Sequence, residues 1–130
     1  MIIDSSALFA ILLQEPEAER IAKAIALDPV RLMSAPTWLE ISIGVFLRIG
    51  DEGLRSLDLL VAKYHIEVVA MTPKQAELAR RAFKQYGKGI HPARLNFGDC
   101  MVYALAKDTG EPLLFKGEDF SKTDIAKVTY

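Results

Sequence analysis

The sequence has one cysteine and no long hydrophobic run. Cys100 has no partner within the chain, which excludes an intramolecular disulfide and makes a reducing compartment the simpler expectation. The longest apolar run, residues 7–13, is far shorter than the roughly 20 residues that a membrane-spanning helix needs. Asp4 stands where a signal peptide would carry a basic residue. We therefore expect a soluble, cytoplasmic protein without a membrane segment.

The chain also lacks an excess of either charge. Its 16 basic and 17 acidic residues give a net charge of −1, so a nucleic-acid-binding role would have to rest on a local patch. Hydrophobic residues make up 51% and charged residues 25% of the 130 residues, which excludes a disordered chain. This length and composition predict a single domain over residues 1–130 with one continuous interior.

Short apolar runs alternate with segments of helical periodicity along the chain. Strands are expected at residues 1–3, 30–33, 66–69, 112–115 and 126–129. Helices are expected at residues 7–13, 16–28, 38–49, 54–61, 73–86 and 99–107. This alternation predicts a three-layer α/β/α, Rossmann-like fold with a mostly parallel central sheet of four to five strands and right-handed crossovers.

Four acidic residues fall near the expected carboxyl ends of strands, where ligands bind in open α/β sheets. They are Asp4, Glu40, Asp99 and Asp119. Each alone is explained as well by helix capping or by a turn; Thr37 and Glu40, for example, have the spacing of a capping box. Together, carboxylates about 5 Å apart would repel by roughly 3 kcal/mol per pair, so a shared pocket would call for a cation. Oxygen ligands without a nearby His or Cys set favour Mg²⁺ or Mn²⁺.

Basic residues cluster later in the chain, where they could grip RNA phosphates or simply form a solvated helix face. They are Arg80, Arg81, Lys84, Lys88, His91 and Arg94. His65 and His91 lack metal-ligand spacing, so structural or substrate-contact roles are expected for both. Cys100 is expected to pack in the core. Trp38 and Phe97 are also expected there, with base-stacking platforms as the alternative role.

Four segments carry a recognisable pattern in their order and spacing. They are Met1–Leu8, Ala35–Glu40, Leu95–Ala106 and Leu113–Asp124. They resemble the PIN domain, and most closely the VapC-type toxins of bacterial toxin–antitoxin pairs. By this resemblance the four acids are catalytic, Asp4 and Asp99 hold the metal ion, and Ser6 and Thr123 support the carboxylates. Whether Asp119 or its neighbour Glu118 faces the site is left open.

The resemblance implies a metal-dependent endoribonuclease that acts as a toxin. An ion held by Asp4 and Asp99 would activate a water molecule, Glu40 would orient or deprotonate that water, and Asp119 would complete the shell. An RNA substrate, a homodimer and a VapB-type antitoxin are implied as partners.

Two other interpretations remain, a non-catalytic protein-binding PIN-like module and a phosphatase or receiver-like α/β domain. The second is disfavoured because Asp4 has no second acid two positions on, and residues 66–69 lead to no phosphoacceptor Asp.

Overall fold

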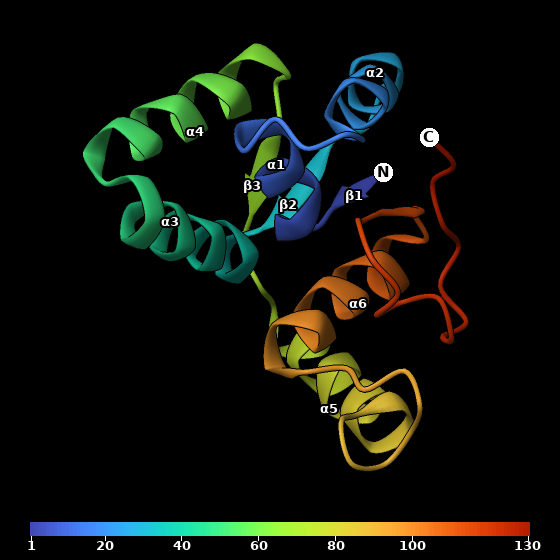
Figure 1. Cartoon of the computed structure of the whole chain (residues 1–130). Helices are drawn as coiled ribbons and strands as arrows, with labels where there is room; N and C mark the ends of the chain where they lie inside the picture. Colours follow the sequence, from blue (N-terminus) through green and yellow to red (C-terminus); the bar gives the residue numbers. More distant parts are fainter.

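Helices cover both faces of a small parallel sheet in the computed structural model, which describes residues 1–130 (Figure 1). The strands are β1 (Ile2–Ile3), β2 (Leu32–Ser34), β3 (Glu67–Val69) and β4 (Leu113–Leu114). They run in the order β3-β2-β1-β4, and every pairing is parallel. The α/β/α fold predicted from the sequence is therefore confirmed, with four strands.

The prediction of a fifth strand at residues 126–129 is wrong. This segment meets the sheet only through an isolated parallel bridge between Leu113 and Lys127. The Leu113 N–H donates to the Ala126 carbonyl at 2.8 Å, and the Val128 N–H donates to the Leu113 carbonyl at 2.9 Å. Because β4 is only two residues long, its outer edge offers too few backbone groups for a longer ladder.

The helices begin where the sequence supplies capping side chains. They are α1 (Ser5–Leu12), α2 (Ala18–Leu27), α3 (Ala35–Ile49), α4 (Asp51–Lys63), α5 (Pro73–Tyr86) and α6 (Phe97–Thr109). Asp4 caps α1, and capping boxes open α5 and α6. Thr37 lies inside α3, whose N-cap is Ser34, so the capping-box explanation of Glu40 is wrong.

The sheet separates two apolar layers, and β1 contributes to both. Ile3 faces the layer formed with α1, α2, α3 and α4, whereas Ile2 faces the layer formed with α5 and α6. This follows from the two-residue period of a strand, and it buries β1 on both faces. The carboxyl end of β1 is thereby fixed at the centre of the molecule.

No helix combines the length and the apolar character that crossing a bilayer requires.

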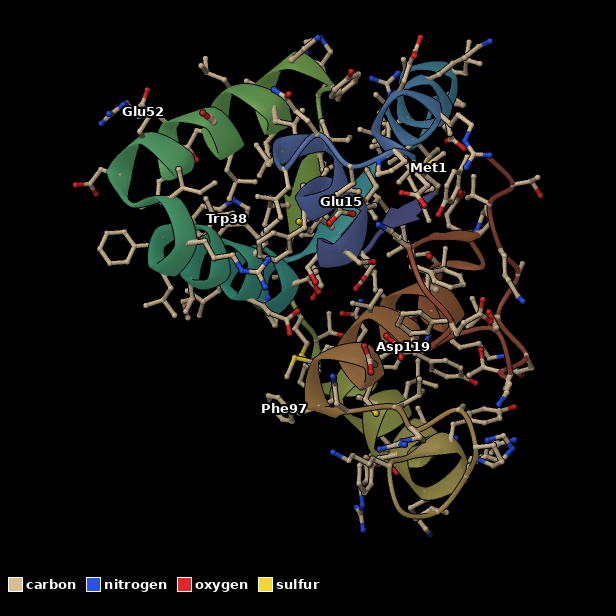
Figure 2. All side chains as sticks on the ribbon, in the orientation of Figure 1. Met1, Glu15, Trp38, Glu52, Phe97 and Asp119 are labelled. Atoms are coloured by element: carbon tan, nitrogen blue, oxygen red, sulfur yellow. The ribbon has the colours of Figure 1, made fainter.

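The predicted core positions are confirmed for two of three residues. Cys100 is buried between α6 and its neighbours, and Trp38 packs against the layer that contains Ile3. Phe97 was predicted to be buried and is 81% exposed, so that prediction is wrong. As the first residue of α6 it lies beyond the edge of the sheet, and its ring projects from the end of the helix (Figure 2).

Truncation of a buried side chain of α3 should destabilise the fold far more than truncation of an exposed one. Ile41 is fully buried, whereas Leu47 on the same helix is 77% exposed. We expect Ile41→Ala to lower the free energy of unfolding by about 2–5 kcal/mol, because it leaves a cavity. Leu47→Ala should change it by less than about 0.5 kcal/mol. Urea titrations measure both, and equal losses would contradict this packing.

Candidate active site

Asp4 follows β1 at the carboxyl edge of the sheet and is 7% exposed. Its Oδ2 accepts hydrogen bonds from the Ser6 hydroxyl and from the Ser6 N–H, the latter at 3.0 Å. The Ser6 hydroxyl oxygen accepts in turn from the Lys116 N–H at 2.9 Å. The backbone after β4 thus orients Ser6, which orients Asp4. Burial raises the pKa of Asp4, and the Ser6 hydrogen bonds oppose that rise.

Asp99 lies in the first turn of α6 and completes its capping box. The Asn96 N–H donates to Asp99 Oδ2 at 2.8 Å, and the Asp99 N–H donates to Asn96 Oδ1 at 2.9 Å. Desolvation raises the pKa of Asp99 to about 6, against the lowering effect of the Asn96 hydrogen bond. The negative charges of the other three acids also raise it. The charges of all three other predicted acids therefore act on Asp99.

Glu40 and Asp119 come from the remaining two segments. Glu40 lies in the second turn of α3, and its Oε2 accepts from the Ser5 hydroxyl at 3.2 Å. Partial desolvation, followed by the charge of Asp4, raises the pKa of Glu40. Asp119 lies in the turn after β4, beside α6 (Figure 2), and its charge raises the pKa of both Asp4 and Asp99. This effect on both groups favours Asp119 over its neighbour Glu118 as the fourth acid.

The acids supply oxygen donors of the kind that a hard divalent cation prefers. One oxygen of each of three carboxylates accepts the hydrogen bonds described above. The second oxygens, Asp4 Oδ1, Asp99 Oδ1 and Glu40 Oε1, accept none of these hydrogen bonds. No three acidic, His or Cys side chains lie close enough together to hold an ion jointly in this structure. Burial first, and then the charges of the neighbouring acids, raise the pKa values of Asp4, Glu40 and Asp99. A cation would stabilise the charged forms of these carboxylates, so the residues present fit one.

Neither histidine joins this set. His91 Nδ1 accepts from the Ala93 N–H at 3.0 Å, and its imidazole packs edge-on against Tyr86. His65 is exposed and holds a left-handed turn with φ 49° after α4. The structural roles expected for both side chains agree with these contacts.

A cleft of about 420 Å³ is lined by both acidic and basic side chains. Its lining includes three acids, Asp99, Glu118 and Asp119, and three cations, Lys88, Arg94 and Lys122. None of these cations forms a salt bridge. Lys122 was not predicted from the sequence, where its position three residues after Asp119 was the available signal.

The other predicted RNA contacts lie on α5, away from this cleft. Arg80 and Arg81 each reach Glu77 at 3.5 Å, and Lys84 is exposed one turn further along. Arg80 also borders an apolar cavity next to Phe97. The basic residues predicted as one group therefore divide into two groups in space.

The hydroxyl-bearing residues also differ from expectation in part. Ser6 contacts Asp4 as the resemblance implied, and Ser5, which was not predicted, contacts Glu40. Thr123 donates to the Phe120 carbonyl at 2.8 Å and accepts from the Ile125 N–H at 3.4 Å. It holds the C-terminal turn and forms no hydrogen bond with any of the four acids.

Comparison with known proteins places this geometry in a family. The family model described as PIN domain matches residues 1–126. Ribonuclease VapC of Mycolicibacterium smegmatis is 52% identical over 128 residues, which cover 98% of this chain and 99% of that protein.

Two solved structures share the fold at low sequence identity. The crystal structure of Mycobacterium tuberculosis VapC20, a sarcin-ricin loop cleaving toxin, matches with a TM-score of 0.78 and 18% identity, covering 98% of this chain and 97% of the other. A toxin–antitoxin complex from Klebsiella pneumoniae matches with a TM-score of 0.74 and 18% identity, covering 99% and 97%.

The raised pKa of Asp99 predicts how charge removal changes stability in the absence of metal. The pKa of Asp99 is about 6 in the folded protein and 3.8 in the unfolded chain. Protonation of Asp99 therefore stabilises the fold, and this contribution is fully present below pH 3.8. That stabilisation is lost as the pH rises through the higher value. Asp99→Asn should therefore raise the Tm at pH 7 by about 4 °C, on the order of 1 kcal/mol after solvent screening.

Thermal melts in EDTA between pH 4 and pH 8 measure this effect. The difference from the wild type should shrink toward pH 4, where Asp99 is protonated in the folded protein. Asp58→Asn, at an exposed position of α4 outside the cleft, serves as the matched control and should leave the Tm nearly unchanged. A lower Tm for Asp99→Asn at pH 7 would show that its charge does not destabilise the fold.

Proposed function

This chain belongs to the PIN-domain family and to its VapC ribonucleases, and from that premise we propose that it is the endoribonuclease toxin of a toxin–antitoxin pair. The observation that carries the proposal is the coupling of four acids from four separate segments, since the other three acids all raise the pKa of Asp99. Such clusters of perturbed carboxyl groups are typical of catalytic sites. The substrate would be RNA, cleaved at its phosphodiester bonds.

The site would work with Mg²⁺ or Mn²⁺. When bound, the ion supplies neutralisation of phosphate charge and activation of water. Asp4 and Asp99 are the residues that would hold it, because each keeps one oxygen free of hydrogen bonds and is fixed through the other. Asp119, at the exposed end of the site, would complete the shell or help to hold a second ion.

Glu40 would orient the attacking water or take its proton. The Ser5 hydroxyl holds Oε2, so Oε1 remains available as the acceptor. Ser6 keeps Asp4 in one orientation, and Asn96 does the same for Asp99. Because water is the nucleophile and not the ribose 2′-hydroxyl, the products would carry 5′-phosphate and 3′-hydroxyl ends.

The basic side chains would hold the RNA backbone. Lys88 and Arg94 line the cleft that contains Asp99 and have no ion-pair partner, so we assign them to phosphates next to the cleaved bond. Arg80, Arg81 and Lys84 would contact more distant phosphates along α5. The two groups are assigned to different phosphates because Lys88 and Arg94 lie in the cleft, whereas the other three lie on α5.

A VapB-type antitoxin and a second copy of the chain are the proposed protein partners. The VapC relationship and the fold shared with the toxin–antitoxin complex from Klebsiella pneumoniae support the first. Exposed apolar side chains support both, because exposed apolar patches mark protein interfaces. They lie mainly on α3 and at the start of α6: Leu39, Ile43, Phe46, Leu47 and Phe97.

The alternative interpretations differ in what they now require. Membership of the PIN-domain family leaves the phosphatase or receiver-like domain without support. A non-catalytic module would keep the fold and the acids without cleaving RNA, so loss of activity on charge removal separates it from a nuclease.

Asp4→Asn should abolish cleavage while the protein stays folded. We expect the rate to fall at least about 100-fold, because one of the two carboxylates that would hold the ion loses its charge. The rate is measured on a labelled structured RNA with Mg²⁺ or Mn²⁺, and the product ends are mapped. Glu52→Gln, in the first turn of α4 and far from the acids (Figure 2), is the control and should cleave normally. Products with 2′,3′-cyclic phosphate would refute attack by water.

Removal of the two cleft cations should weaken RNA binding through charge alone. In the Asp4→Asn background, Lys88→Gln combined with Arg94→Gln should flatten the slope of log K against log salt by about 1.4. The matched control, Lys23→Gln combined with Arg55→Gln, removes two exposed cations from α2 and α4. Filter binding at several salt concentrations measures both pairs, and equal slopes would place the RNA elsewhere.

A further inference from the structure

Two glycines stand at opposite ends of α6, and only one of them serves the backbone. Gly110 ends the helix with φ 74°, in the left-handed region that favours glycine. Gly98 lies in the first turn, and its φ is not positive. Alanine would fit that backbone and forms helices better than glycine. The conformation of α6 therefore does not account for a glycine at position 98.

The space next to Gly98 does account for it. A Cβ atom placed on this residue would lie 2.6 Å from Glu40 Oε1 and 3.2 Å from both Glu40 Cδ and Oε2. Nonbonded atoms do not approach as closely as the first of these distances. The carboxylate of Glu40 thus occupies the volume in which any side chain at position 98 would begin.

This close approach holds Glu40 between two other helices. From α3, its carboxylate reaches the Ser5 hydroxyl in the first turn of α1 and Gly98 in the first turn of α6. Asp4 and Asp99 carry like charges nearby, and the flexible Glu40 side chain lies at the exposed edge of the site. If a side chain at position 98 filled this space, repulsion from Asp4 and Asp99 would favour a Glu40 carboxylate further out in solvent.

We infer that Gly98 is a positioning residue of this site: its missing side chain admits the Glu40 carboxylate against the first turn of α6, beside Asp99. The inference rests on the proposed role of Glu40 in the nuclease reaction. Gly98 makes α6 a poorer helix and relieves no backbone strain. What it provides is the position of one oxygen, Glu40 Oε1, which accepts no hydrogen bond from the protein.

Gly98→Ala separates positioning from folding. The added methyl group meets the mobile end of a side chain, so Glu40 should move and the backbone should not. We expect an unchanged or higher Tm, together with a fall in kcat of at least about 10-fold and a change in KM below about 2-fold. In a Glu40→Ala background, the same substitution should alter the remaining rate by less than about 2-fold, because no carboxylate is left to displace.

Gly110→Ala, on the same helix, is the matched control with the opposite expected result. It forces alanine into a left-handed conformation, so it should lower the Tm and leave cleavage by the folded protein unchanged. A crystal structure of metal-free Gly98→Ala protein provides a readout independent of activity. It should show Glu40 displaced from α6 and its hydrogen bond with Ser5 lost.

Three results would overturn the inference. They are an unmoved Glu40 carboxylate in the variant, a lower Tm for Gly98→Ala, and an equal loss of rate in the wild-type and Glu40→Ala backgrounds. Failure of the proposed function is distinguishable, since the wild type would then cleave no RNA while the crystal structure still reported the position of Glu40. Normal cleavage by Gly98→Ala beside strongly slowed cleavage by Glu40→Ala would instead refute the positioning role alone.

Discussion

Carboxylates that repel one another are held together at the carboxyl edge of a buried parallel sheet, and the surrounding structure is arranged to tolerate that repulsion. The backbone of Asp4 is fixed in place, because β1 is buried on both faces and the Asp4 N–H donates to the Leu114 carbonyl at 3.0 Å. Asp99 is fixed to the start of α6 by its capping box. Burial raises the pKa of both groups, and the charges of neighbouring acids raise them further.

The hydrogen bonds around the acids limit this repulsion without using up their coordinating capacity. Ser6, Asn96 and Ser5 each bind one oxygen of a different carboxylate. Each donor fixes an orientation, and each leaves the other oxygen free for a ligand. Such partial satisfaction suits a site that is completed by a cation, since full satisfaction by the protein would leave nothing for the cation to bind.

Charge is separated locally although the chain as a whole is nearly neutral. The acids gather where strands end, whereas Lys88, Arg94 and Lys122 line the cleft that runs beside them. A polyanion can be held at such a wall while its phosphodiester lies near the acids. The net charge of −1 therefore gives no indication of this local arrangement.

The sequence by itself determined the alternation of strands and helices and singled out four acids as a candidate site, because these depend on local periodicity and on residues at the ends of strands and helices. Only the tertiary structure decided that Phe97 is exposed, that residues 126–129 form a single bridge, and that Lys122 joins the cleft. It also decided that Gly98 faces Glu40, a contact between residues 58 positions apart (98 − 40). Local patterns report the period of one element, whereas these features depend on how the ends of different elements meet in space.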